Sequence, residues 1–339
     1  MFDRFSLADL SIRVLAAPMA GGLSTPELAA AVSNAGGLGF LAGDLSSAEE
    51  LADAILAARK LTSGAVGVNL LVPQQAVANE DQLSAFESAL APEAERYGVP
   101  VGEPCHDDEW DAKLDVVCDL RPEVVSFTFG SPSEEQSRRL HGLGILNLAT
   151  VTTVREALIA VSYGVDAVVA QGPEAGGHRA TFDAIAAPPD DALDDLVSAL
   201  AYCFVCPVVA AGGLGTPRDV SRLRDAGATA VQLGTALLLA DEAGTNPVHR
   251  AALRDPQFTR TVVTRAFTGR YGRALRNRFT DEHEPEAIFG FPQVAMMTAP
   301  IQATAVELGD PHGAALWAGA AFHHAKAAPA ADIVRELAG

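Results

Sequence analysis

Residues 210–217 read Ala210-Ala211-Gly212-Gly213-Leu214-Gly215-Thr216-Pro217, so an apolar run, a glycine turn and a helix start follow one another directly. Threonine followed by proline is typical of the first positions of a helix. A second turn, Gln232-Leu233-Gly234-Thr235-Ala236, follows the next apolar run. Glycines let a backbone approach a phosphate closely, and the N-terminus of the next helix offers unpaired N–H donors. The two turns therefore predict a phosphate-bearing ligand beside two neighbouring strands.

Short apolar runs recur along the chain, and a helix-like stretch follows each of them. Their length and β-branched content are typical of strands that are buried on both faces of a parallel sheet. The runs are 14–17, 38–42, 65–71, 124–127, 145–149, 167–170, 208–211 and 230–233. Helix starts are marked by Thr25-Pro26, by Thr153 and by Thr216-Pro217.

Eight strand–helix repeats indicate an α/β protein, either a closed (β/α)8 TIM barrel or a long doubly wound sheet. The glycine turns follow the seventh and eighth runs, where barrels commonly bind phosphate. A dinucleotide-binding sheet would carry G-x-G-x-x-G after its first strand. The first run instead leads into Ala17-Pro18-Met19-Ala20-Gly21-Gly22, which lacks that spacing. The sequence therefore predicts the barrel.

Two stretches are longer than a barrel requires. Residues 72–122 follow the third run and contain helix-like segments at 81–97 and 109–120. Residues 255–339 follow the barrel and look mostly helical, with a glycine- and arginine-rich loop near the start. We expect a barrel over 1–254 with an insertion at 72–122, and a lid over 255–339. Both additions follow strands, so both are predicted to cover the C-terminal mouth.

Composition excludes several classes of partner. The formal net charge of −19 argues against nucleic acid, because phosphate backbones require a basic surface, and against an anionic membrane surface. No apolar run reaches the roughly 18–20 residues of a membrane span. Residues 1–4, Met-Phe-Asp-Arg, lack the features of a signal peptide, so a cytoplasmic location is expected. No feature of the sequence indicates an oligomeric state.

Cys203 and Cys206 form a C-x-x-C, which is compatible with a redox pair or with half a zinc site. The other two cysteines, Cys105 and Cys118, do not form a second pair with ligand spacing, so no metal site is expected. Because the pair runs into an apolar strand, we expect Cys203 and Cys206 to be buried structural thiols.

A histidine follows the sixth run, in Gln171-Gly172-Pro173-Glu174-Ala175-Gly176-Gly177-His178-Arg179. Catalytic groups of β/α barrels collect just past the strands, at the C-terminal face. An imidazole delivered there by a glycine pair is a candidate acid, base or anion-binding group. We therefore predict that His178 is catalytic.

In order and spacing, the chain resembles the nitronate monooxygenases, formerly called 2-nitropropane dioxygenases, and is most similar to their class I. The resemblance covers essentially the whole chain. It rests on Ala17-Pro18-Met19-Ala20-Gly21-Gly22, Ser24–Leu28, Gly67-Val68-Asn69, Ser126-Phe127-Thr128-Phe129-Gly130, Gln171-Gly172, Glu174–His178, Ala211-Gly212-Gly213, Gln232–Thr235, Thr268-Gly269-Arg270 and Asn277.

The resemblance implies flavin mononucleotide (FMN) as cofactor and a small nitronate and O2 as reactants, with nitrite and a carbonyl compound as products. It implies that Met19 and Asn69 line the flavin and that Gln171 reaches its ring or ribityl chain. Backbone N–H groups would hold the ribityl phosphate, and His178 matches the catalytic histidine. The implied phosphate-binding residues are Gly176, Gly213, Gln232, Leu233, Gly234 and Thr235.

The chain departs from the class I pattern at two places. Thr128 stands where a histidine is expected, and Met296 and Met297 stand where polar or aromatic residues are expected. Both changes would make the substrate pocket less basic and more pliable. Two alternatives stay open: a flavin-dependent enoyl-thioester reductase that uses NAD(P)H, with the arginines of 270–278 facing an anionic partner, and a flavin- or phosphate-binding protein without turnover.

Overall fold

The computed structural model describes residues 5–44, 46–104 and 108–339, so the N-terminal tetrapeptide and Cys105 lie outside the described residues. All eight predicted strands are present. They are β1 (Val14–Ala16), β2 (Gly39–Ala42), β3 (Val66–Leu71), β4 (Val124–Thr128), β5 (Leu146–Val151), β6 (Ala167–Gln171), β8 (Val208–Ala211) and β9 (Ala230–Leu233).

The strands form one parallel sheet in the order β1-β9-β8-β6-β5-β4-β3-β2. The sheet closes where β1 meets the residue before β2: Ala16 N donates to Leu38 O (2.9 Å), and Leu38 N donates to Val14 O (3.0 Å). The chain is therefore a (β/α)8 TIM barrel, as the eight apolar runs predict.

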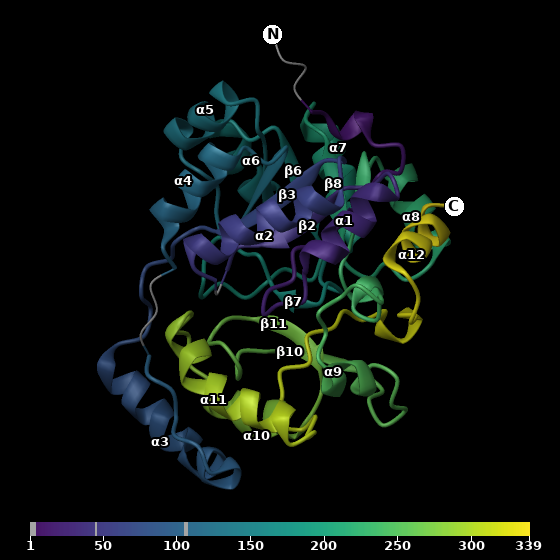
Figure 1. The fold of residues 1–339 in the computed structure, drawn as a ribbon. Coiled ribbons are helices and arrows are strands. Elements are labelled where there is room, and N and C mark those ends of the chain that lie inside the picture. The colour runs from purple at the N-terminus through teal and green to yellow at the C-terminus, as the bar shows by residue number, and fades with distance from the viewer. Residues whose placement is uncertain (1–4, 45, 105–107) are drawn as a thin grey trace.

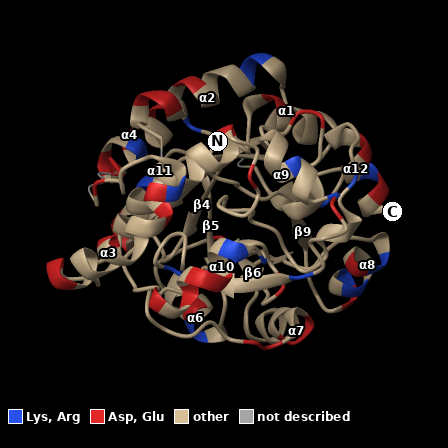
Figure 2. Cartoon of the chain, turned by 90° about the horizontal axis from the view of Figure 1, so that it is seen from below, with Lys and Arg blue, Asp and Glu red and all other residues tan. Residues whose placement is uncertain are grey.

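Helices surround the sheet in a ring that is visible when the molecule is viewed from below (Figure 2). The ring consists of α1 (Pro26–Asn34), α2 (Ala48–Leu61), α4 (Trp110–Leu120), α5 (Glu134–Gly142), α6 (Val154–Ser162), α7 (Leu193–Cys203), α8 (Pro217–Asp225) and α12 (Ala330–Ala338). The predicted helix starts are confirmed, because the hydroxyls of Thr25, Thr153 and Thr216 accept backbone N–H bonds from the first turns of α1, α6 and α8.

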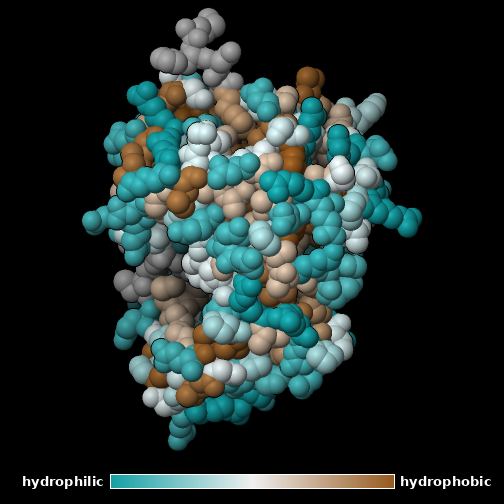
Figure 3. Space-filling view, turned by 45° about the vertical axis from the view of Figure 1, so that its right-hand side comes forward, coloured by the Kyte–Doolittle hydropathy of each residue, from teal (hydrophilic) through white to brown (hydrophobic). Residues whose placement is uncertain are grey.

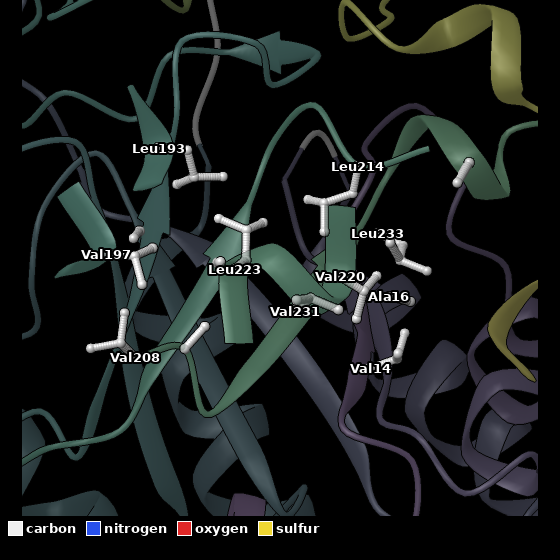
Figure 4. Close-up of a cluster of buried hydrophobic side chains, with 14 of the residues drawn as sticks. Val14, Ala16, Leu193, Val197, Val208, Leu214, Val220, Leu223, Val231 and Leu233 are labelled. Carbon is white, nitrogen blue, oxygen red and sulfur yellow. The ribbon is translucent and has the colours of Figure 1, made fainter. Parts of the chain in front are cut away.

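The main core lies between the strands and this ring (Figure 4). Val208 and Val231 of the strands pack there against Leu200 of α7 and Leu223 of α8. A second core fills the inside of the barrel, where Leu7 of the short helix η1 (Leu7–Asp9) packs with inward-facing strand residues. The strands are thus buried on both faces.

A further layer covers one end of the barrel, in the lower part of Figure 1. It contains α3 (Glu80–Tyr97), α9 (Pro247–Ala252), α10 (Arg278–His283), α11 (Gln293–Glu307) and a hairpin of β10 (Thr261–Thr264) and β11 (Gly272–Leu275). Phe86 and Leu90 of α3 share a core with Phe279 of α10 and Ile301 of α11. The insertion after β3 and the C-terminal region therefore form one lid.

The structure corrects the predictions for the insertion and the C-terminal region in three places. The second helix of the 72–122 insertion, α4, packs through Leu114 and Val117 against Leu51 and Ile55 of α2, so it belongs to the ring. The last helix, α12, packs its apolar face on the barrel core, because a ring with a strand-to-helix repeat needs a helix after β9. The glycine- and arginine-rich segment, expected as a loop, contains β11. The division at residue 254 stays a prediction.

Candidate active site

His178 lies in β7 (Gly177–His178), a two-residue strand in the loop that follows β6. β7 pairs antiparallel with β11 of the lid hairpin, with Gly272 opposite His178. The next residue, Arg179, donates its N–H to Tyr271 O (2.8 Å). The lid hairpin thus fixes the backbone of the predicted catalytic histidine at the barrel mouth.

Three aromatic rings and one hydroxyl surround the imidazole. The ring centroids of Phe129, Phe291 and Trp317 lie 5.6, 5.2 and 5.4 Å from that of His178. Nε2 of His178 lies 2.9 Å from Thr268 Oγ1. Among the described residues, no protein group forms a hydrogen bond with Nδ1 of His178, and this atom is not fully buried. The site therefore holds a half-buried imidazole in a mainly apolar cage.

Arg270 places a buried positive charge next to this cage. Its guanidinium carbon stands 3.7 Å from the centroid of the Phe129 ring, and its side chain is only 1% exposed. Its hydrogen bonds go to Thr181 O and, at 3.5 Å, to Gln74 Oε1, and no carboxylate pairs with it in the described part of the chain. Burial lowers the pKa of Arg270 to about 10, so it stays protonated at neutral pH.

Desolvation, together with the charge of Arg270, lowers the pKa of His178 to about 3. The imidazole is therefore neutral at pH 7. A histidine here could stabilise an anion as an imidazolium or accept a proton as a neutral imidazole. The lowered pKa disfavours the first role and favours the second. The positive charge available to an anionic substrate comes instead from Arg270.

Gln171, at the end of β6, forms hydrogen bonds to the backbone of the His178 loop through both its amide nitrogen and its amide oxygen. Its Nε2 donates to His178 O (2.9 Å), and its Oε1 accepts from Ala180 N (2.9 Å). The side chain predicted to reach a flavin thus holds His178 in place. Its contact with the cofactor stays a prediction.

The loops after β6, β8 and β9 converge, as the glycine turns predict. A Cβ on Gly176 would stand 2.5 Å from Gly319 N, so the two backbones pack directly. Gly319 N in turn donates to Thr235 Oγ1 (2.9 Å). A Cβ on Gly213, whose φ is +71°, would collide with the carboxylate of Glu174. Three barrel loops and one segment of the C-terminal region therefore build a single glycine-lined cradle.

The cradle has unused hydrogen-bond donors. The backbone N–H groups of Gly176, Gly213, Gly234 and Thr235 donate to no acceptor among residues 5–44, 46–104 and 108–339. Converging backbone donors that lack acceptors suit an anion with several oxygens. Glu174 is exposed, and its flexible side chain can turn away from Gly213. The residues present fit a phosphate group.

The other predicted cofactor residues lie around the same mouth. Asn69, buried in β3, donates its Nδ2 to Ser126 Oγ (2.8 Å) and to Thr128 Oγ1 (3.1 Å) of β4. Thr128, one of the two departures from the class I pattern, thus anchors Asn69. Met19 follows β1 and is partly buried. Gln232 and Leu233 are buried in β9, in the parallel ladder, and their contact with a phosphate stays a prediction.

A small cavity of about 60 Å³ lies beside the cage and is lined by Phe291, Pro292, Asp108 and residues 71–74. Phe291 separates it from His178, since its ring contacts the imidazole. Met297 does not take part in this cavity. It is 1% exposed and packs in the lid core, and its effect on a substrate pocket stays a prediction.

The cysteine prediction also needs correction. Cys203 is exposed at the end of α7, and Cys206 is half-buried in the turn before β8. Both thiols are free, and burial raises the pKa of Cys206. The apolar run begins only at Val208, so the pair precedes the buried strand. Cys118 is buried in α4, on the face packed against α2.

Several site residues were not singled out by the sequence analysis. Thr268 and Arg270 were visible only as part of a Thr-Gly-Arg resemblance, and Phe129 only as part of a strand motif. No motif in the sequence around Trp317 and Gly319 indicated that these residues belong to the site. Their partners lie far away in the sequence, and only the closed lid brings them to the barrel.

Comparison with known proteins agrees with this architecture. Residues 6–339 match the family described as nitronate monooxygenase. The chain is 38% identical to the nitronate monooxygenase of Pseudomonas aeruginosa, over 99% of this chain and 98% of that protein. A solved nitroalkane oxidase from Streptomyces ansochromogenes is 42% identical, has a TM-score of 0.92 and covers 98% of this chain and 96% of its own. FabK from Thermotoga maritima is 26% identical, with a TM-score of 0.75, over 98% and 93% of the two chains. The chain therefore belongs to the nitronate monooxygenase family and is an oxidoreductase.

Proposed function

We propose that this enzyme binds FMN without a covalent link and oxidises alkyl nitronates with O2 to a carbonyl compound and nitrite. One observation carries the proposal: a neutral His178, enclosed by three aromatic rings, stands beside an unpaired buried Arg270 at the mouth of a barrel with a phosphate cradle. Family membership supplies the reaction class, and the site supplies the roles of the residues.

The cradle would hold the terminal phosphate of FMN through the N–H groups of Gly176, Gly213, Gly234 and Thr235. When bound, FMN accepts electrons from the substrate and passes them to O2. The donors without acceptors converge on one cradle, which suits a single terminal phosphate and so favours FMN over a dinucleotide. Asn69 and Met19 would line the ring system.

Arg270 attracts an anionic substrate toward the cage. Its charge acts across the Phe129 ring in a site that the aromatic side chains keep poor in water, where Coulomb attraction is stronger than in bulk solvent. The three aromatic rings that enclose His178 favour a small alkyl group on the substrate. These features favour a short-chain nitronate.

His178 accepts a proton when the substrate arrives as a neutral nitroalkane. A base works best when its pKa lies near the working pH, and that of His178 is about 3. Abstraction from a nitroalkane is therefore uphill, and the preformed nitronate, which needs no such step, is the preferred substrate.

The reaction test uses the purified, flavin-loaded protein. An alkyl nitronate should drive O2 consumption and release nitrite without NAD(P)H. NAD(P)H oxidation with an enoyl thioester, and no nitrite from the nitronate, would establish the reductase alternative. A flavin-loaded protein that turns over neither substrate would be a binding protein.

The cofactor test is independent of turnover. Purified protein should be yellow, and the flavin released by heat should have the mass of FMN and not of FAD. A colourless protein that cannot be reconstituted with FMN would contradict the whole proposal.

A further inference from the structure

The ring of His178 is held by a short chain of hydrogen bonds in the lid. Nε2 of His178 lies 2.9 Å from Thr268 Oγ1, and the same hydroxyl donates to Arg270 O at 3.2 Å. Thr268 is 8% exposed and Arg270 is 1% exposed, so both partners are shielded from solvent. A buried polar group without a partner is costly, so the direction of each bond matters.

The direction of the chain follows from the number of hydrogens. A threonine hydroxyl has one hydrogen, and here it goes to the Arg270 carbonyl. The hydroxyl can then only accept from His178, which places a hydrogen on Nε2. The reverse arrangement, with the hydroxyl donating to Nε2, would leave the buried Arg270 carbonyl without a donor among the described residues. A neutral imidazole with hydrogen on Nε2 carries its lone pair on Nδ1.

The position of Thr268 is itself fixed by the turn in which it lies. The N–H groups of Thr268 and Gly269 both donate to Arg265 O, at 3.2 and 2.7 Å. Gly290 N donates to Gly269 O at 3.1 Å. The hydroxyl is therefore held in place by the lid backbone, independently of the imidazole it contacts.

We propose that Thr268 is a positioning residue that sets the tautomer of His178, with hydrogen on Nε2 and with Nδ1 as the proton acceptor. The inference rests on the proposed function for its role in turnover. In the step it serves, the α C–H bond of a nitroalkane breaks and its electron pair stays on the substrate, which becomes a nitronate. The proton forms a new N–H bond at Nδ1, while Nε2 keeps its own hydrogen and continues to donate it to Thr268 Oγ1.

The first test observes the tautomer directly. Protein labelled with 15N in its eight histidines is studied by NMR at pH 7, with and without FMN, and the His178 signals are assigned by their loss in His178→Asn. We expect a protonated Nε2 and an unprotonated Nδ1 in the wild type. A wild-type His178 with its hydrogen on Nδ1 would overturn the proposal, whatever the activity of the protein.

The second test changes the hydroxyl. Thr268→Val should give a mixture of tautomers and lower kcat/KM for a nitroalkane by about 3- to 10-fold, the worth of one buried hydrogen bond, with little loss on the nitronate. Thr268→Ser should restore both the tautomer and the rate. Thr245→Val is the matched control, since the Thr245 hydroxyl is buried and has no partner among the described residues.

The outcomes separate the two proposals. An unchanged tautomer in Thr268→Val, or equal losses in Thr268→Val and Thr245→Val, would overturn the role of Thr268. A wild type that shows the expected tautomer but produces no nitrite would overturn the proposed function and leave the assignment of the ring nitrogens standing. If Thr268→Val does not fold, the wild-type spectrum and Thr268→Ser still decide the question.

Discussion

The behaviour of His178 follows from neighbours of three kinds. Aromatic rings shield the imidazole from water, and the charge of Arg270 opposes its protonation. The Thr268 hydroxyl accepts a hydrogen bond from Nε2 and so keeps the one ring hydrogen on that nitrogen. Each neighbour acts on a different property of the imidazole: solvation, charge and tautomer. A histidine at the same position without these neighbours would titrate near neutrality.

Gly213 permits a sharp test of the phosphate cradle. Gly213→Val would fill the space beside Glu174 and displace a backbone donor, so FMN should bind about 10- to 150-fold more weakly, the worth of one hydrogen bond to a charged group. Gly144→Val is the matched control, because Gly144 has a similar φ of +80° and nothing within 4 Å of the added Cβ. Flavin content per folded protein is measured, and an equal effect of both variants would count against the cradle.

The C-x-x-C that precedes β8 provides a second prediction for single residues. Changing both Cys203 and Cys206 to alanine should leave turnover per bound flavin within about twofold of wild type, since surface substitutions away from the site have small effects. The measurement is nitrite release at matched flavin concentration. Complete loss of turnover with flavin retained would reveal a redox role for the pair.

Among the helices and strands, most of the barrel could be predicted from the sequence, and little of the lid could. Alternating apolar runs and capped helices are local signals, so all eight strands and the starts of α1, α6 and α8 were predicted correctly. The assignment of α4 and α12 to a lid was wrong, because an amphipathic helix does not reveal which surface it packs against. The pairing of β7 with β11 depends on residues about 95 positions apart and had no local signal.

The same limit applies to the site. His178 and the glycine turns stand at strand ends and could be predicted from the fold alone. Arg270, Trp317 and Gly319 come from the C-terminal region, far along the chain from their partners, so their roles depend on tertiary packing.

Gln171 tests how firmly β6 holds the His178 loop. Gln171→Leu removes both amide contacts with the loop, so turnover should fall while FMN binding changes little. Loss of two hydrogen bonds of about 1 kcal/mol each corresponds to a rate loss of roughly 30-fold. The measurements are kcat and the dissociation constant of FMN. A large loss of FMN affinity with normal turnover of the loaded protein would instead support a direct flavin contact.

In the whole molecule, acidic residues are spread along the helices of the ring and of the lid (Figure 2). In the face shown in Figure 3, hydrophobic residues form small scattered groups among hydrophilic ones. No described helix combines the length and the apolar character needed to cross a membrane. The charge is thus a property of the exterior, while the site keeps a buried positive charge at Arg270.

Buried histidines make the stability of the whole fold depend on pH. The pKa values of His178 and His249 are lowered to about 3 and about 4, mainly by desolvation. Below about pH 6.5 the unfolded chain binds protons at these two histidines and the folded chain does not. The free energy of unfolding therefore decreases as the pH is lowered. Asp44, whose pKa burial raises to about 6, opposes this trend.

The destabilisation from His178 and His249 at low pH is larger than the stabilisation from Asp44. The free energy of unfolding should therefore fall by an amount on the order of 2–3 kcal/mol between pH 7 and pH 5. Urea denaturation at the two pH values measures the change. His249→Gln removes one of the two buried histidines and should reduce the pH dependence. A stability that rises between pH 7 and pH 5 would contradict the buried neutral histidines.

The role of His178 as a base is tested by comparing wild type and His178→Asn on one compound, supplied as the preformed nitronate and as the neutral nitroalkane. The wild type should prefer the nitronate. His178→Asn should lower kcat/KM for the nitroalkane by about 100- to 10,000-fold, the usual range for a general base, with a smaller loss on the nitronate. Equal losses on both forms would show that His178 stabilises the bound anion. Unchanged rates on both forms, with FMN still bound, would contradict a catalytic role for His178.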